Sequence, residues 1–163
     1  MKGNTYIALD LKTSGLDCYE DEITAIRAIK FHSISHQELF SCRIIRPGHP
    51  DENNSFNGYD LKDLTLLYPD AYAKFLEFIE KSFLLSHYTY ADKLFFENAC
   101  FKYKLPMFDN PWIDTNEIVM AQKRINADQI IEVAKALDIH KSLKNDIFYR
   151  AQITKDIFIR SIN

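Results

Sequence analysis

The segment Tyr6–Lys12 reads YIALDLK and is followed by Thr13–Gly15, TSG. The apolar run, with its aromatic and β-branched residues, favours a short buried strand, and Thr-Ser-Gly is a turn signal. Asp10 lies near the end of this strand, where burial of a carboxylate costs free energy unless a cation, a helix end or a ligand stabilises it. The segment therefore predicts a central strand that carries a buried acid close to its carboxyl end.

Two further strands are predicted directly after the first. Ile23–Phe31 alternates two mostly apolar faces, which is typical of a central strand covered on both sides. Leu39–Ile45 is a third apolar run, and Pro47 and Gly48 end it. Because the links between the three runs are short, we expect an antiparallel meander.

The rest of the chain has a different pattern. From Pro69, apolar residues recur at helical spacing, and Phe83–Ser86 and Pro111–Asp114 are brief apolar runs that favour buried parallel strands. Further helices are predicted over Asp92–Tyr103, Thr115–Lys123, Ala127–Leu137 and Asn145–Ile162. We therefore predict one α/β domain over residues 1–163. Its mixed sheet would have about five strands, a three-stranded antiparallel meander plus two parallel strands, with helices on both faces.

Composition narrows the class of protein. The chain has 163 residues, 47% of them hydrophobic and 26% charged, which fits one packed domain. Its formal net charge of −3 excludes a polycation that holds nucleic acid by bulk electrostatics alone. Cys18, Cys42 and Cys100 are odd in number and far apart, which argues against a disulfide framework or a structural zinc site and favours reduced thiols in the cytoplasm. No apolar run is long enough to cross a membrane, so we expect no membrane partner.

Three places carry polar residues beside strand or helix ends. Asp10 and Lys12 are two apart and leave the same face of the strand, so an ion pair is the simplest interpretation. Asp92 lies at the start of a predicted helix, whose N-terminus a carboxylate stabilises by roughly 0.3–1 kcal/mol. Residues 140–146, HKSLKND, open the last predicted helix, where Asn and Asp commonly serve as N-caps.

Taken together, these segments resemble the DnaQ-like (DEDDh-type) 3′–5′ exonuclease family of the ribonuclease H-like superfamily. The family's first motif is two apolar residues, Asp, an apolar residue, Glu-Thr, Thr or Ser, and Gly-Leu. Ala8–Leu16, ALDLKTSGL, matches it except at one position. Asp21–Ile23 matches the opening of the family's next strand, Leu85–Asp92 its second motif and Trp112–Thr115 its Ile-Asp-Thr strand end. The third motif, His, four residues and Asp, begins at His140. The resemblance extends over about residues 5–161.

The resemblance implies a nuclease in which four acids bind two Mg²⁺ or Mn²⁺ ions at the scissile phosphate. A histidine would act as general base on the attacking water, and a mononucleotide would leave the 3′ end of single-stranded DNA or RNA. A polymerase or another replication or repair protein would be the expected partner. The residues so implied are Asp10, Asp92, His140 and Asp146 for catalysis, Asp10, Asp92 and Asp146 for the metal, and Thr13, Ser14 and His87 for the substrate.

Two positions depart from the family's pattern. Lys12 stands where the first motif has Glu, which removes a negative ligand and adds an ammonium to the same strand face. The four-residue gap after His140 ends at Asn145, and Asp146 reaches the last acidic position only through a one-residue bulge. A unit charge at about 4 Å is worth roughly 4 kcal/mol at an effective dielectric constant of about 20. These changes should therefore weaken dication binding by orders of magnitude.

We therefore expect a pseudoenzyme of this family, a weak exonuclease at best, that binds nucleic-acid ends. It would hold Mg²⁺ or Mn²⁺ only if active, and Lys12 could pair with Asp10 and a phosphate oxygen in place of a metal. Phe95 and Phe96 either approach the nucleotide groove or belong to the core. The alternative is a non-catalytic protein-interaction module that retains only the fold.

Overall fold

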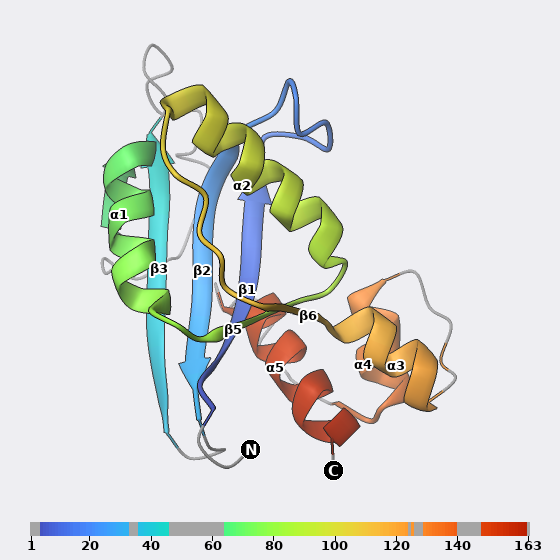
Figure 1. Ribbon diagram of the computed structural model, residues 1–163. Coiled ribbons are helices and arrows are strands. Elements are labelled where there is room, and N and C mark those ends of the chain that lie inside the picture. Colours follow the sequence, from blue (N-terminus) through green and yellow to red (C-terminus); the bar gives the residue numbers. More distant parts are fainter. Residues whose placement is uncertain are drawn as a thin grey trace.

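A computed structural model describes residues 4–32, 36–45, 64–123, 125, 129–139 and 148–162 (Figure 1). The strands in these ranges are β1 (Tyr6–Thr13), β2 (Ile23–Phe31), β3 (Gln37–Ile45), β4 (Leu64–Leu67), β5 (Phe83–Ser86) and β6 (Trp112–Asp114). The helices are α1 (Tyr68–Ile79), α2 (Thr89–Tyr103), α3 (Thr115–Lys123), α4 (Ile130–Ala136) and α5 (Tyr149–Ile162). None of these helices is both long and apolar enough to cross a membrane.

All six described strands form one sheet in the order β4-β3-β2-β1-β5-β6. β1, β2 and β3 pair antiparallel, whereas β5 pairs parallel with β1, and β6 pairs parallel with β5. This confirms the predicted mixed sheet, a meander extended by two parallel strands. The sequence did not predict β4, which pairs parallel with β3 and continues directly into α1.

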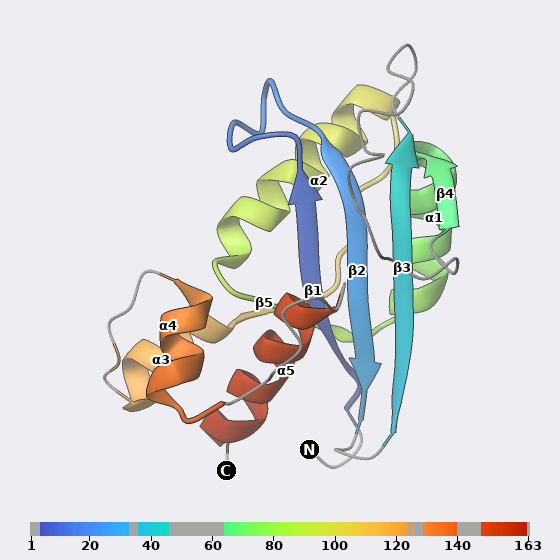
Figure 2. The same cartoon turned by 180° about the vertical axis from the view of Figure 1, so that it is seen from behind.

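Helices cover both faces of the sheet, as expected. α1 and α2 lie on one face, and α5 lies across the other, with α3 and α4 beside it (Figures 1 and 2). Pro69 in the first turn of α1 suits a helix start, because its missing N–H and fixed φ cost nothing there. The predicted starts at Ala127 and Asn145 lie outside the described residues.

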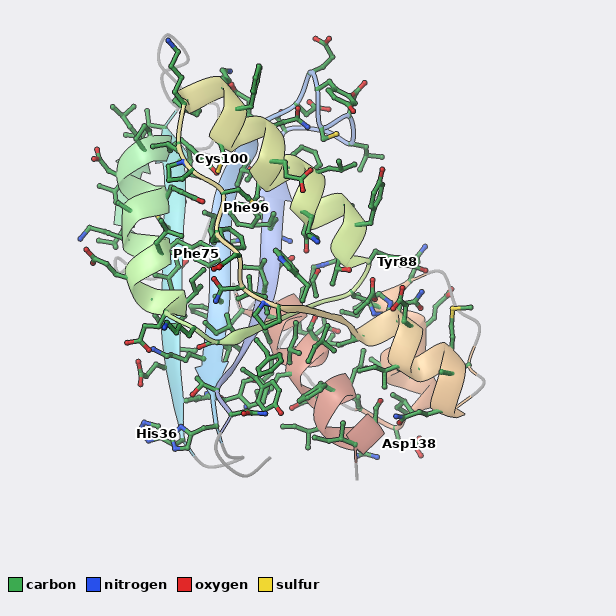
Figure 3. All side chains as sticks on the ribbon, viewed as in Figure 1. His36, Phe75, Tyr88, Phe96, Cys100 and Asp138 are labelled. Atoms are coloured by element: carbon green, nitrogen blue, oxygen red, sulfur yellow. The ribbon has the colours of Figure 1, made fainter. Side chains whose placement is uncertain are left out.

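Aromatic rings fill the core on both faces. Phe75 of α1 and Phe96 of α2 are fully buried and stack with ring centroids 5.4 Å apart, and Figure 3 shows both between the two helices. On the other face, Tyr6 of β1 packs against Phe158 of α5, with ring centroids 4.8 Å apart. Phe95 is 7% exposed, so Phe95 and Phe96 both belong to the core.

The topology brings the carboxyl ends of several strands to one edge of the sheet. Because β5 runs parallel to both β1 and β6, the carboxyl ends of these three strands point the same way. The links from β5 to α2 and from β6 to α3 leave at that edge. An ion pair from the first turn of α5 also reaches the end of β1. In open α/β sheets, ligands commonly bind at this edge.

The aromatic core gives a direct stability test. Phe96→Ala should lower the free energy of unfolding by about 3–5 kcal/mol, because it removes a fully buried ring and leaves a cavity. Phe101→Ala, one and a half turns further along α2, should change it little, because Phe101 is 87% exposed. Urea unfolding measures both, and equal losses would contradict the described face of α2.

Candidate functional site

Asp10 near the end of β1 is the centre of the candidate site. Its side chain is only 7% exposed, and each of its two carboxylate oxygens faces a cation. Lys12 Nζ lies 3.2 Å from Oδ2, and Arg150 Nε, from the first turn of α5, lies 3.3 Å from Oδ1. The strand periodicity predicted the Lys12 pair. It did not predict Arg150.

A third cation lies in register with this acid. Arg27 is directly opposite Asp10 in the antiparallel pair of β1 and β2, so the two side chains leave the same face of the sheet. Arg27 is 5% exposed, and its Nε has no hydrogen-bond partner in the structure. Two cations therefore pair with the Asp10 carboxylate, and a third lies opposite it on the neighbouring strand.

Asp92 in the first turn of α2 belongs to the same cluster. Its carboxyl group accepts a hydrogen bond from Ser86 Oγ at the end of β5. Burial, together with the carboxylates of Asp10 and Asp114, raises the pKa of Asp92, and Ser86 and Arg150 oppose the rise, so that the resulting pKa is about 7. Asp10 and Asp92, 82 positions apart in the sequence, thus influence each other electrostatically. Near pH 7, Asp92 is partly protonated.

Asp114 at the end of β6 organises the start of two helices. Its carboxylate accepts hydrogen bonds from the backbone N–H groups of Tyr88 and Thr89 at 3.2 and 2.8 Å and from Thr89 Oγ1 at 3.1 Å. It also accepts one from the N–H of Asn116 in α3 at 2.8 Å. The backbone of Tyr88 is in the left-handed region, with φ of 67°, and its side chain does not cap the helix. Asp114 at the end of β6 caps α2 instead. This explains why α2 begins at Thr89, before the predicted start at Asp92.

His87 presents an unsatisfied acceptor in this cluster. Thr115 Oγ1 donates its one proton to the Ser86 carbonyl at 3.2 Å and lies 3.0 Å from His87 Nδ1. We therefore assign the proton of His87 to Nδ1, which donates to Thr115. His87 Nε2 is then a buried lone pair with no hydrogen-bond partner in the structure. Burial lowers the pKa of His87, Arg150 adds to this and Asp114 opposes it, so the ring is neutral near pH 7.

Thr13 and Ser14 hold the turn after β1. Thr13 Oγ1 donates to the Gly15 carbonyl at 2.6 Å, and Ser14 Oγ donates to Asp21 at 2.9 Å and accepts from the Glu22 N–H at 3.0 Å. The Asp21 carboxylate lies so close to Gly15 that a side chain there would collide with it. Both hydroxyls are thus used within the turn, and a ligand would have to replace these bonds.

The structure brings Asp10, Lys12, Asp92 and His87 of the predicted site together. His140, Asn145 and Asp146 lie outside the described residues. Within the described ranges, no three or more His, Cys, Asp or Glu side chains are grouped so that they could hold a metal ion.

Sequence reasoning missed Arg150 and Ser86. Arg150 carries one usable signal, since a cation in the first turn of a helix opposes the helix dipole and needs a partner. Ser86 gives no such signal, because its bond to Asp92 depends on how α2 leaves β5.

Comparisons with known proteins agree with this architecture. No protein-family model matches the chain. DNA polymerase III PolC-type from Pediococcus pentosaceus is 25% identical over 119 residues, which cover 71% of this chain and 8% of that polymerase.

Exonuclease I is among the similar solved structures. Its product-bound structure matches with a TM-score of 0.68 at 17% identity, over 96% of this chain and 43% of that chain. The zinc-bound Escherichia coli exonuclease I–ssDNA complex matches with a TM-score of 0.66 at 18% identity, over 97% and 40%. This chain therefore has the α/β ribonuclease H-like exonuclease fold that its motifs predicted, and it spans about two fifths of exonuclease I.

The raised pKa of Asp92 predicts a pH dependence of stability. In the folded protein Asp92 holds its proton up to about pH 7, whereas in the unfolded chain it loses it near pH 3.8. The folded state therefore binds more protons in this window, and the contribution of Asp92 to stability falls as pH rises through it. Asp92→Asn removes this loss. Between pH 4 and pH 8, the free energy of unfolding of the variant should therefore rise relative to that of the wild type by on the order of 1–3 kcal/mol.

Urea unfolding at a series of pH values measures this difference. Glu97→Gln, an exposed position on the same helix, is the control and should follow the wild-type curve at every pH. If Asp92→Asn also followed the wild-type curve, the Asp92 carboxyl group would be ionised in the folded protein.

Proposed function

We propose that this chain binds the 3′ end of a single-stranded nucleic acid through a positively charged version of an exonuclease centre, and that it hydrolyses phosphodiester bonds weakly or not at all. One observation carries the proposal: Lys12 and Arg150 pair with the two oxygens of Asp10. The fold supports the choice of ligand, because exonuclease I, which has a similar fold, forms a complex with single-stranded DNA.

The described residues do not fit two dications. Mg²⁺ and Mn²⁺ bind through ionised oxygen ligands. The oxygens of Asp10 already face two cations, and Asp92 keeps its proton to about pH 7. A dication beside Lys12 and Arg150 would meet a repulsion of roughly 4 kcal/mol per pair of unit charges at 4 Å and an effective dielectric constant of about 20. The described residues therefore do not support a two-metal reaction.

The same residues fit an anion. With Asp92 protonated, the cations Lys12, Arg150 and Arg27 outnumber the carboxylates of Asp10 and Asp114. The side chains of Lys12 and Arg150 are 39% and 50% exposed, so both can reach a ligand from solvent. A guanidinium can donate two parallel hydrogen bonds to a phosphate, and an ammonium provides a compact charge beside it. A phosphate of the terminal nucleotide would therefore be held here.

Neighbouring groups suit the nucleoside. His87 Nε2 offers an acceptor to a hydroxyl or base N–H donor. Tyr90 in the first turn of α2 is 75% exposed, and stacking of a base on an aromatic ring is worth roughly 1–3 kcal/mol. Leu16 in the turn after β1 is 98% exposed and offers an apolar contact. Thr13 and Ser14 would contribute through the turn that they hold. His140 and Asp146 keep the roles that the resemblance implies only if some hydrolysis survives.

The similarity to a polymerase supports a place of action beside a polymerase or another replication or repair protein. Cys18, Cys42 and Cys100 are all free thiols, which suits the cytoplasm.

Binding without metal is the first test. A fluorescent oligothymidylate with a free 3′ end should bind in the presence of EDTA, and its affinity should fall with salt. Lys12→Ala and Arg150→Ala should each weaken binding several-fold and reduce the slope of log affinity against log salt by about 0.7 per lost charge. Fluorescence anisotropy over a salt series measures both quantities.

Lys74→Ala is the matched control, because Lys74 is an exposed cation on α1, at the other side of the sheet (Figure 1). It should leave both affinity and slope unchanged. Absence of binding to both DNA and RNA would refute the proposal and leave the alternative, a protein-interaction module that retains only the fold.

Restoration of the acidic set tests the inherited centre. Lys12→Glu with Asn145→Asp returns the family's acids but leaves Arg150 on Asp10. We therefore expect the triple variant that adds Arg150→Gln to bind Mn²⁺ and to release nucleotides at a clearly higher rate than the double variant. Isothermal titration with Mn²⁺ and a nucleotide-release assay measure the two properties.

The control combines Lys12→Glu and Asn145→Asp with Lys74→Gln, which removes a distant cation instead. It should behave as the double variant does. A folded triple variant that neither binds Mn²⁺ nor releases nucleotides would show that the cluster at Asp10 is not an exonuclease centre that has lost its acids.

A further inference from the structure

A second candidate site lies at the other end of α2. A cavity of about 440 Å³ opens between the loop at residues 18–23 and the C-terminal half of this helix. None of the residues around Asp10 lines it, so it is separate from the proposed nucleic-acid site.

The inner part of this cavity is aromatic and contains one unsatisfied polar group. Tyr68 and Tyr103 line it and stack with ring centroids 5.0 Å apart, and Phe95 lies beside them. Tyr68 is 2% exposed, and its buried hydroxyl has no hydrogen-bond partner in the structure. Burial and the neighbouring Cys100 thiol raise the pKa of this phenol, so it keeps its proton and can donate it. A ligand carbonyl that reached this hydroxyl would satisfy it.

The rim of the cavity is acidic. Glu20, Asp21 and Glu22 line the loop side, and Lys102 on the helix side pairs with Glu22. Three carboxylates against one ammonium leave a negative rim, which attracts a cation and repels a phosphate. A nucleic-acid strand is therefore a poor occupant, in contrast to the cluster around Asp10.

Large apolar side chains also line the cavity from the solvent side. Tyr19 of the loop and Phe101 of α2 are 77% and 87% exposed, yet both contribute to its lining. Exposed aromatic side chains around a buried pocket are typical of protein-binding surfaces. The Glu22–Lys102 ion pair links the loop to the helix, so the two sides of the cavity are held together.

We infer that this cavity docks a segment of a partner protein in which an aromatic side chain is next to Lys or Arg. The ring would enter between Phe95 and Tyr103, a backbone carbonyl would accept from Tyr68, and the cation would meet Glu20 and Asp21. The proposal depends on this cavity alone and holds whether or not the chain binds nucleic acid.

A matched pair of peptides tests it. The probes are acetyl-fluorophenylalanyl-arginine amide and acetyl-fluorophenylalanyl-glutamate amide, observed through the ring fluorine by ¹⁹F NMR on the full chain. We expect the arginine peptide to bind about tenfold more tightly than the glutamate peptide at low salt. Equal binding of the two, or no binding of the arginine peptide up to millimolar concentration, would overturn the inference.

Variants then locate the site. Glu20→Lys changes an exposed rim residue and should reduce or reverse the preference for the arginine peptide, whereas Glu77→Lys on α1 makes the same charge change elsewhere and should not. Tyr68→Phe keeps the ring but removes the hydroxyl, and it should weaken the binding of both peptides several-fold. If Glu20→Lys and Glu77→Lys gave the same result, the peptide would be bound elsewhere and the inference would fail.

A competition separates this inference from the proposed function. Saturating oligothymidylate should leave the affinity for the arginine peptide unchanged, because the two sites share no residue. Displacement of the peptide by the oligonucleotide would overturn the assignment of a separate site.

Discussion

The buried carboxylate of Asp10 pairs with two cations, and a third cation lies opposite it on the neighbouring strand. Lys12 comes from the same strand, Arg27 from the neighbouring strand and Arg150 from the last described helix. A carboxylate that is taken out of water without such partners costs several kcal/mol or binds a proton instead. The folded chain therefore needs the first turn of α5 against the end of β1, and an electrostatic requirement in the centre of the sheet fixes where the C-terminal helix begins to pack.

This arrangement changes which ligand the edge of the sheet can stabilise. A cluster of acids alone would favour dications, whereas here the cations balance or exceed the acids. Burial, with a smaller contribution from the neighbouring carboxylates, lets Asp92 keep its proton to about pH 7. The proton on Asp92 and the cations on Asp10 are two responses to the same constraint, namely that several carboxyl groups share a site with little water. An anionic ligand satisfies that constraint, because it can accept from Lys12 and Arg150 together.

The sequence predicted those parts of the fold whose signals are local. β1 and β5 are largely apolar runs, β2 has two mostly apolar faces, and the ion pair of Lys12 with Asp10 follows from the two-residue period of a strand. β4 was missed because its four residues, LTLL, continue into a helix and are a strand only through pairing with the edge of β3. The start of α2 was placed three residues late because its cap, Asp114, lies 25 positions downstream of Thr89. Arg150 was missed for the same reason, since its partner lies at the other end of the chain.

α2 connects the two surfaces that this fold offers. Asp92 lies in its first turn and Phe101 in its last, about 14 Å apart along the axis at 1.5 Å per residue. The cations around Asp10 lie near the first end of α2, and the acidic rim of the cavity lies near the other end. Phosphates are attracted to the first and repelled by the second, while a basic peptide has the opposite preference. Under the two proposals, charge sorts the ligands to opposite ends of one helix, so neither would need to leave for the other to bind, and a protein docked at the cavity would be held beside a nucleic-acid end at Asp10.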